Sequence, residues 1–524
     1  MNRFYTNSGK CALWVFLFFS ALYIFSMGGH GYGGVGTTTY DVTRSIVLEH
    51  SVAIQPVPWG KVGYDGRFYA QYGIGHSVYN IPFYLLGHAL TLLSPALAAQ
   101  YARLTMFTTL LGQPVISALT CALLLLFCRK AGYALNTSCT CALLYGLGTQ
   151  AWMYAQLDFS EPILTFFLLS AAYLAHRPGG RPAHSAANLV LSGLCLGIAM
   201  TVKIVAVIVL PVFFVYIMSG SDSAGIRSSL KKAVLFGFPV LLAGFGIVGA
   251  YNMLRFANPF ETGYGSEFTF CYTDVLRHIG ENLWGLEGSI FFYSPVILLA
   301  LCGARRFFLR FGEFALLTWG VVATFFLFYP FTTNELYYGP RYLTPTLPFF
   351  LVVTGAYLEN SSIGSVAQTL RKYLIAGLLV LGIGQQLLGV VVNYHTFYWR
   401  IQYTLPLADE TVRLSDYGQL LRATPELPHI QGHLWLVKHA VSDLFHRNGF
   451  PLQGIELLSN VQDRNAFIPY YGLDLWWAHA KFVAASGGVM PVAIVLFLIS
   501  VMGAALFRLR DISCQSGNVW WGSL

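Results

Sequence analysis

The segments GTTTYDVTRSIVLEHS (Gly36–Ser51) and YDGRFYAQYGIGHS (Tyr64–Ser77) lie in one polar stretch, His30–His76, directly behind the first long apolar run of the chain. The polar stretch carries Asp41 and Asp65 among aromatic residues and glycines, whereas the chain around it is strongly apolar. We expect the apolar run to cross a membrane and the polar stretch to form a functional loop outside it. The same alternation continues along the chain and decides the fold.

The composition excludes a soluble protein. Apolar residues make up 56% of the 524 residues, charged residues only 10%, and the mean hydropathy is +0.58, whereas soluble domains contain roughly a quarter charged residues. The apolar runs are continuous and about twenty residues long, which predicts spanning helices and not barrel strands. The sequence therefore predicts an all-α polytopic membrane protein, surrounded by lipid, with no nucleic-acid partner.

The hydropathy predicts about twelve spanning helices (11 to 13). The run Ser77–Leu93 is long enough to span, but it carries Asn80, Pro82 and His88, and we expect it to lie at the membrane interface. The spans are expected at Cys11–Met27, Leu104–Phe127, Ser138–Gln156, Pro162–His176, Ala187–Thr201, Ile204–Met218, Ala233–Leu254, Ser289–Cys302, Glu313–Phe331, Leu343–Leu358, Tyr373–Asn393 and Phe482–Phe507.

The basic residues orient these spans, because short cytoplasmic loops are enriched in Lys and Arg. With the interfacial run left out, every short basic loop falls on one side, together with both termini. These loops carry Arg129, Lys130, Arg177, Arg181, Arg227, Lys231, Lys232, Arg305, Arg306, Arg310, Arg371, Lys372, Arg508 and Arg510. The other side receives the His30–His76 loop and the turns at Asp158, Lys203 and Arg341.

Three parts are expected along the chain. Residues 1–393 form the transmembrane catalytic region with its active-site loop at 30–76, residues 394–481 form a small extracytoplasmic cap, and residues 482–524 form the last helix and a cytoplasmic tail. The cap is too small to be a second enzyme. Its histidines, His429, His433 and His439, have no acidic ligand beside them, which favours surface or packing roles over a metal site.

Charged residues near membrane depth are costly and are candidates for function. A fold that joined those of the external side would create one site with carboxylates for proton abstraction and cations for an anionic group. The candidates are Asp41, Asp65, Asp158, Glu161, Lys203, Arg255 and Arg341.

Each candidate carboxylate has a structural alternative. Asp41 is also suited to cap the amphipathic helix expected at TYDVTRSIVLEHS. Asp65 precedes Gly66, a common turn pair, and Arg67 is a ready partner for it. Asp158 is suited to cap the helix that follows it.

The candidate cations have alternatives as well. Lys203 interrupts an apolar run of over thirty residues, so it lies at the turn between two short spans, where it either snorkels or holds a lipid phosphate. Arg255 ends a helix, where its charge favours the helix dipole. Arg341 follows Gly339 and Pro340 among tyrosines, a setting that suits a phosphate or a sugar.

The order of these features resembles the GT-C superfamily of integral-membrane glycosyltransferases. The bacterial branch that it resembles is similar to dolichyl-phosphate-mannose-protein mannosyltransferases and to lipid A aminoarabinose and galacturonic acid transferases. The resemblance extends to about Asn393. Besides Asp41, it rests on DGRFYAQYGIGHSVYNIPFYLLG, LDFSEP, GLCLGIAMTVKIVAVIVLP, YNMLRFANPFETGYG, GSIFFYSPVILLAL and YYGPRYLTPTLP.

The resemblance implies roles for the site residues. Asp41 would act as catalytic base, and Asp158 would support the site. Many family members have Asp-Glu in this loop, whereas Val42 follows Asp41 here, so Asp65 or Asp158 would supply the second carboxylate. No cofactor is assigned, and a divalent cation, Mg²⁺ or Mn²⁺, held by Asp41 and Asp158 is left open.

Further residues are expected to bind the donor and to line the site. The donor phosphate would meet Lys203, Arg341, Tyr342, Arg255 and Arg67. The substrate would be lined by Tyr40, Tyr69, Tyr72, His76, Glu161 and Tyr338.

The resemblance implies a single inverting displacement at the anomeric carbon of a polyprenyl-phosphate sugar, on the outer face of a bacterial inner membrane. The acceptor, whether lipid A, a polysaccharide, a phospholipid or a protein, stays open, and so does the choice between a hexose and a pentose. Three alternatives stay open. They are a lipid-linked-sugar flippase or transporter, an O-antigen-ligase or polymerase type of membrane protein, and a non-catalytic sugar-binding membrane protein.

Overall fold

The computed structural model describes residues 2–57, 60–177, 185–219, 226–264, 275–285, 288–332, 338–359, 365–393, 430, 433, 434, 437, 473–478 and 489–515. These residues are almost entirely helical, which confirms the predicted fold class. The sheet found among them has three very short antiparallel strands in the order β1-β3-β2, at β1 (Ala53–Ile54), β2 (Gly60–Val62) and β3 (Phe68–Ala70). Most of the predicted cap, residues 394–481, lies outside the described residues.

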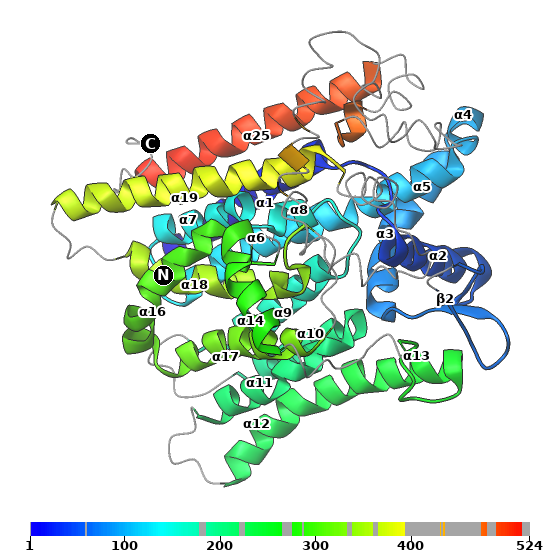
Figure 1. Cartoon of the computed structure of the whole chain (residues 1–524), viewed down its shortest axis with the longest axis horizontal. Coiled ribbons are helices and arrows are strands. Elements are labelled where there is room, and N and C mark those ends of the chain that lie inside the picture. Colours follow the sequence, from blue (N-terminus) through cyan, green and yellow to red (C-terminus); the bar gives the residue numbers. More distant parts are fainter. Residues whose placement is uncertain are drawn as a thin grey trace.

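Figure 1 shows how the helices follow one another along the chain. The first half of the chain contains α1 (Asn2–Ser26), α2 (Gly34–Glu49), α3 (Ile74–Thr91), α4 (Pro95–Ala98), α5 (Tyr101–Leu110), α6 (Gly112–Lys130), α7 (Leu135–Gly148), α8 (Ala151–Tyr154), α9 (Glu161–Ala175), α10 (Ala186–Val202), η1 (Ile204–Val209), α11 (Leu210–Ser219), α12 (Ile226–Pro239), the π-helical η2 (Val240–Gly246) and α13 (Ile247–Phe256). The second half contains α14 (Val275–Trp284), α15 (Ile290–Tyr293), η4 (Pro295–Ile297), α16 (Leu298–Phe311), α17 (Glu313–Phe328), η5 (Tyr329–Phe331), η6 (Arg341–Thr346), α18 (Leu347–Leu358), α19 (Ser365–Val391), η9 (Trp476–Ala478) and α25 (Val489–Gln515).

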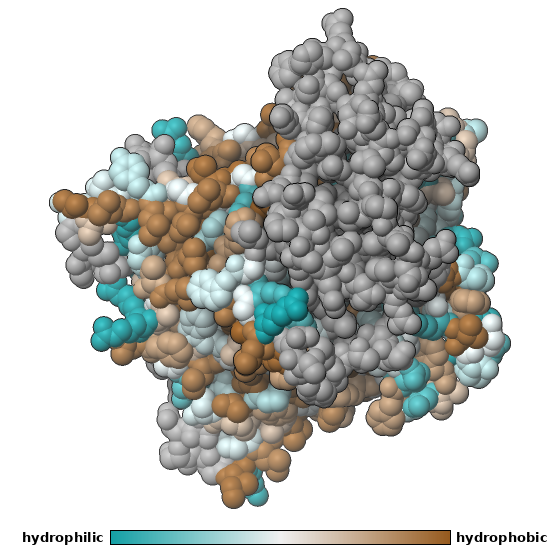
Figure 2. Space-filling view, in the orientation of Figure 1, coloured by the Kyte–Doolittle hydropathy of each residue, from teal (hydrophilic) through white to brown (hydrophobic). Residues whose placement is uncertain are grey.

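The buried centre and the apolar outside are built from different helices. Helix α6 packs against α1, α7 and α9, and most of its side chains are buried. By contrast, apolar side chains of α12, α19 and α25 face outward, and Figure 2 shows brown apolar surface over α12 and α19. A large exposed apolar surface of this kind is expected where helices meet lipid.

Six of the described helical segments are long and apolar enough to cross a membrane, where the hydropathy predicted about twelve spans. They are Asn7–Ser26, Tyr101–Lys130, Ile226–Phe256, Glu313–Phe331, Ser365–Val391 and Val489–Ile512. Three more of the predicted spans are shorter apolar helices, at Glu161–Ala175, Ala186–Val202 and Ile204–Ser219. The predicted spans at 138–156, 289–302 and 343–358 are interrupted helices, so the count of twelve is not confirmed.

The connections predicted to be cytoplasmic meet at one end of the helices. Arg310 pairs with Glu359 at 2.7 Å and donates a hydrogen bond to Gly132 O at 3.2 Å. Arg129 of the same region donates to Ser8 at 3.2 Å. The contacts therefore join basic loops that are far apart in the sequence, as the charge pattern predicted.

The polar loop behind α1 folds into α2, the small sheet and α3. Helix α3 packs against α2, α5 and α10 and is not among the six candidate spans. Helix α2 begins at Gly34, so Asp41 lies in the middle of this helix. The capping interpretation of Asp41 is therefore wrong, because the helix begins at Gly34, seven residues before Asp41.

Candidate active site

The side chain of Glu161 lies between two cations. Its Oε1 accepts a hydrogen bond from Lys203 Nζ at 2.8 Å, and Arg341 Nε lies 3.9 Å from the same oxygen. The Glu161 side chain is only 2% exposed and that of Arg341 6%. The formal charges of these three described side chains sum to +1.

Aromatic rings cover these cations. Lys203 Nζ lies 4.1 Å from the ring centre of Tyr342, and the Arg341 guanidinium donates to the Tyr342 hydroxyl at 2.7 Å. The Arg341 guanidinium also lies over Phe159 at 4.8 Å, and Tyr329 stacks on Tyr342 at 4.7 Å. We call Glu161, Lys203, Arg341 and Tyr342 the cation cluster.

Breaks in the helices bring the cluster together. Lys203 ends α10 with an extended backbone, before the chain continues in η1. Arg341 begins η6 directly after Pro340, and the preceding Gly339 has a φ of +76° that suits glycine. The sequence predicted both positions as turns, and the structure confirms them.

The N-terminus of α3 reaches the same place, because Gly73 and Gly75 allow a close approach. A Cβ at Gly73 would overlap the carbonyl oxygens of Thr201 and Val202, the two residues before Lys203. The N-terminus of a helix carries a partial positive charge. This end of α3 therefore lies within the region of the cation cluster.

Asp158 lies in the turn before α9, buried against the start of α2. Its Oδ2 accepts a hydrogen bond from the backbone N–H of Tyr32 at 3.2 Å, and a Cβ at Gly36 would overlap the carboxylate. Its Oδ1 has no hydrogen-bond partner among the described residues. Burial raises the pKa of Asp158 to about 6, against the lowering effect of the Tyr32 N–H. The predicted capping role is wrong, because the carboxylate binds the first loop.

A small polar cavity opens beside Asp158. His76, Gln113 and Tyr40 line it together with Asp158, and its empty volume of about 220 Å³ is below the range of pockets that enclose a whole ligand. His76 Nε2 lies 3.0 Å from the amide nitrogen of Gln113, while His76 Nδ1 and Gln113 Oε1 have no partner among the described residues. The cavity therefore offers unused polar atoms for a hydroxyl group.

Asp41 lies on the same helix as Gly36 but on its partly exposed side. Five residues, or about 7.5 Å of helix rise, separate it from the point where Gly36 touches Asp158. Burial raises the pKa of Asp41, and the charge of Arg44 opposes this rise. Asp41 is accessible, and it makes no contact with the cation cluster in the described part of the chain.

Asp65 and Arg67, predicted as site residues, form an exposed hairpin pair instead. Arg67 Nε donates to Asp65 Oδ2 at 2.6 Å, and the Tyr69 hydroxyl donates to the same oxygen at 2.9 Å. The side chain of Arg67 is 61% exposed. These contacts match the turn interpretation of the Asp65-Gly66 pair, and none of them joins the hairpin to the cation cluster.

Arg255 is turned into the protein, away from the role of a phosphate ligand. It is buried, donates to Ala70 O and to Asn252 Oδ1, and lies over the ring of Tyr251 at 3.8 Å. It thereby ties α13 to strand β3. Its described contacts are structural. The sequence predicted that Arg255 ends a helix, but it did not predict the contact with strand β3.

The predicted lining tyrosines have different surroundings. Tyr40 lines the cavity, and its hydroxyl lies 2.7 Å from Thr105 Oγ1. Tyr72 contacts the ring of Tyr264 at 6.3 Å. Tyr338 is fully buried, and its hydroxyl donates to Gln385 O of α19, so it packs against a helix and does not line the cavity.

Three residues of the site were not predicted. Gln113, Tyr329 and Phe159 come from α6, η5 and the turn before α9. Phe159 stands inside the quoted motif LDFSEP and was accessible to sequence reasoning. Gln113 was the one strongly polar residue near the start of an apolar run, a signal that we did not use.

The described residues contain no group of three or more His, Cys, Asp or Glu side chains arranged to hold a metal ion. Asp158 Oδ1 and the accessible Asp41 carboxylate are nevertheless oxygen donors of the kind that Mg²⁺ takes, and this ion usually binds only one or two carboxylates, together with water and phosphate.

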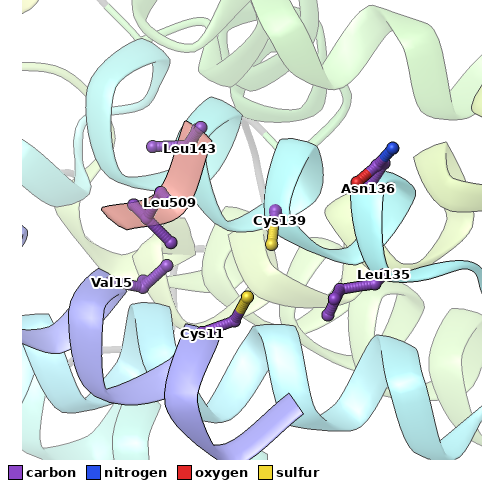
Figure 3. A pocket seen from close by; sticks show the side chains of 7 residues that line it. All are labelled: Cys11, Val15, Leu135, Asn136, Cys139, Leu143 and Leu509. Carbon is purple, nitrogen blue, oxygen red and sulfur yellow. The ribbon is translucent and has the colours of Figure 1, made fainter. Parts of the chain in front are cut away.

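A second cavity has a different character. It lies between α1, α7 and α25, and Figure 3 shows the sulfur atoms of Cys11 and Cys139 pointing toward one another across it. The remaining lining residues are Val15, Leu135, Asn136, Leu143 and Leu509, and none of them is charged. This cavity lacks the groups that acid–base or phosphate chemistry needs.

Comparisons with known proteins give a distant likeness. No family model and no curated protein matches the sequence. The chain is similar to a crystal structure of ArnT from Cupriavidus metallidurans in the apo state, at 14% identity and a TM-score of 0.48 over 93% of this chain and 75% of that one. It is also similar to ArnT bound to undecaprenyl phosphate, at 15% identity and a TM-score of 0.44 over 96% of this chain and 78% of that one.

ArnT is a GT-C glycosyltransferase, so these solved structures come from the superfamily whose motifs the sequence resembles.

Proposed function

We propose that this chain is an inverting glycosyltransferase that moves a sugar from a polyprenyl-phosphate donor to an acceptor outside the cytoplasm. The observation that carries the proposal is the cation cluster, which holds two cations, Lys203 and Arg341, on one buried carboxylate. Glu161 of the cluster is three residues after Asp158 in the chain, and Asp158 borders a polar cavity.

The charge of the cluster fits the donor. A polyprenyl-phosphate sugar is a phosphodiester with one negative charge, and the net charge of the cluster is +1. Glu161 holds the two cations at fixed positions and keeps them from repelling one another when no ligand is bound. Tyr342 and Phe159 cover the cations and lower their exposure to water, and Tyr329 stacks on Tyr342.

The same cations favour the transition state over the bound donor. As the bond from the anomeric carbon to the phosphate oxygen breaks, negative charge grows on the leaving phosphate. Fixed cations bind that developing charge more strongly than the original diester, which lowers the barrier. Lys203 and Arg341 are the groups that we assign to this task.

The acceptor hydroxyl loses its proton as it attacks, and we assign Asp41 as the base. Asp41 is partly exposed and lies on the helix that packs against Asp158, so an acceptor from outside can reach it. A single attack opposite the leaving phosphate inverts the anomeric centre. Asp158, whose Oδ1 is unused, is assigned to orient the sugar or the acceptor in the polar cavity.

A divalent cation would add positive charge near the reacting oxygen, and it would be held by Asp41 or by Asp158 together with water and phosphate, because about 7.5 Å of helix rise separates the two positions. The residues of the chain do the remaining work, since Lys203 and Arg341 bind the phosphate and the polar cavity orients hydroxyl groups. The enzyme is expected in a bacterial inner membrane with the site on the outer face, as the basic loops predict.

Binding of undecaprenyl phosphate tests the cluster without knowledge of the sugar. Lys203→Met and Arg341→Met should each weaken binding about tenfold to a hundredfold, since charge-assisted contacts are worth about 1.5–3 kcal/mol. Arg67→Met is the matched control, because Arg67 is an exposed cation outside the cluster. Unchanged affinity in both cluster variants would return Lys203 to the snorkelling interpretation and remove the basis of the proposal.

A further inference from the structure

The segment Leu473–Ala478 closes the end of α1 although more than 440 residues separate them. The indole N–H of Trp476 donates to Ile24 O at 2.8 Å, and that of Trp477 donates to Phe25 O at 2.9 Å. The last carbonyl groups of a helix have no partner within the helix. Both tryptophans therefore satisfy the end of α1 and fix the segment there.

The carboxylate of Asp474 is aimed at the first residues of the polar loop. Its Oδ1 lies 2.6 Å from His30 Nε2, and its Oδ2 accepts a hydrogen bond from the Tyr32 hydroxyl at 2.7 Å. The Asp474 side chain is 2% exposed. A Cβ at Gly28 would overlap both the Tyr32 hydroxyl and Asp474 Oδ1, so glycine is required for this contact.

Both nitrogens of His30 face acceptors. Nε2 faces Asp474 and Nδ1 lies 3.0 Å from Gly31 O, so the doubly protonated ring satisfies both contacts by donating. Asn393 lies 3.5 Å from Nε2, and Asp158 is the second negative charge that acts on the ring. Burial by itself would lower the pKa of His30, but the charge and hydrogen bond of Asp474 raise it to about 8.

The network continues into the candidate site. Tyr32, whose hydroxyl binds Asp474, is the residue whose backbone N–H binds Asp158 Oδ2 at 3.2 Å. Gly31 lies beside the same oxygen, since a Cβ there would be 3.6 Å from it. The position of the Tyr32 N–H thus depends on a carboxylate that comes from near the other end of the chain.

We propose that Asp474 is a positioning residue, which through His30 and Tyr32 holds the backbone N–H that orients the Asp158 carboxylate. This inference rests on the proposed function, in which Asp158 borders the reacting groups. Asp474 itself does not touch substrate. Protonated His30 strengthens the connection, so the activity should be sensitive to pH near the pKa of His30.

A double-mutant cycle tests the connection without any sugar transfer. The thermal unfolding midpoint is measured for Asp474→Asn, Asp158→Asn and the double variant. Residues in one hydrogen-bond network show non-additive effects, so the double variant should lose less than the sum of the two single losses. Trp477→Phe is the matched control, because it removes one hydrogen bond of the same segment and leaves the carboxylate, and its effect should add to that of Asp158→Asn. Additive effects of Asp474→Asn and Asp158→Asn would overturn the inference.

Transfer from radiolabelled polyprenyl-phosphate sugars gives the second readout. Asp474→Asn should lower kcat about tenfold to a hundredfold, the scale of a small displacement at a reacting group, and leave KM for the donor unchanged because the cation cluster is intact. Wild-type transfer should fall as the pH rises through about 8, and in Asp474→Asn this fall should move toward the ordinary histidine pKa of about 6.5. If transfer by Asp474→Asn falls at the same pH as transfer by the wild type, the inference is overturned. Absence of transfer by the wild type would contradict the proposed function, while the double-mutant cycle would still decide the role of Asp474.

Discussion

Asp41→Asn separates general-base chemistry from every structural role that the fold gives Asp41. The residue lies in the middle of α2 on its partly exposed side, so it does not cap the helix. Asn has the same size and nearly the same helix propensity as Asp. The substitution removes an attraction to Arg44, worth about 0.2–0.5 kcal/mol for a helical pair at this spacing, and it also removes the opposing cost of burying the Asp41 charge. The thermal midpoint should therefore change by about 1 °C or less.

The effect on transfer should be far larger. A general base contributes about 10²–10⁴ in rate, or about 2.7–5.4 kcal/mol of barrier. The assay is transfer of radiolabelled sugar from polyprenyl phosphate in reconstituted membranes, with binding of undecaprenyl phosphate measured alongside. The variant should bind the lipid normally, because Lys203 and Arg341 are unchanged.

Asp65→Asn is the matched control. It makes the same chemical change in the exposed hairpin, where Asp65 binds Arg67 and Tyr69, and it should leave transfer unchanged. Near-normal transfer by Asp41→Asn would refute the assignment of the base. Asp158, the other carboxylate beside α2, would then be tested first.

Three further predictions follow from the surroundings of the site. Transfer should rise as the pH rises through about 6, because burial raises the pKa of Asp158 to that value and the ionised carboxylate is the stronger hydrogen-bond acceptor for substrate. A flat profile between pH 5 and 7 would contradict this. Gly36→Ala should abolish transfer, because the new methyl group would displace the Asp158 carboxylate. Gly377→Ala is the control and should leave transfer intact, because nothing lies within 4 Å of a methyl group added there. Equal effects of the two substitutions would contradict the contact between Gly36 and Asp158. Arg255→Met should lower the thermal midpoint by several °C, since it removes charge-assisted hydrogen bonds of about 1.5–3 kcal/mol each. The affinity for undecaprenyl phosphate should stay unchanged. A loss of affinity without a loss of stability would restore Arg255 as a phosphate ligand.

The helical membrane fold could be predicted because lipid requires the backbone to satisfy its own hydrogen bonds, which leaves long apolar runs as the visible signal. The positions of the breaks were predictable only where a residue marked them. Lys203 and the Gly339-Pro340 pair predicted turns, and the structure has helix breaks at both positions. The interruption at Ser294 and the π-helical turn after Pro239 were missed, because a run of apolar residues looks the same whether or not one hydrogen bond is displaced.

The candidate site could be predicted in its parts and not in its connections. Lys203 and Arg341 were expected to hold a phosphate, but Glu161 was expected only to line the substrate, whereas it lies between the two cations. Asp65 and Arg67 pair locally, as their spacing allowed. Asp474 was missed altogether, because its partner His30 is 444 residues away and no local pattern encodes such a contact.

The three charged residues of the cation cluster all lie at helix ends, and this explains why their charges are tolerated near an apolar surface. Glu161 is the first residue of α9, Lys203 follows the last residue of α10, and Arg341 is the first residue of η6. At a helix end, the backbone N–H or C=O groups have no partner within the helix, so they need polar surroundings even where no charged side chain is present. Placing the cations at these points adds charge where the membrane is already interrupted, whereas the same residues in mid-helix would face lipid or a dry core. The site is consequently built from short, broken helices, and the long apolar helices that the hydropathy detects most easily lie around it.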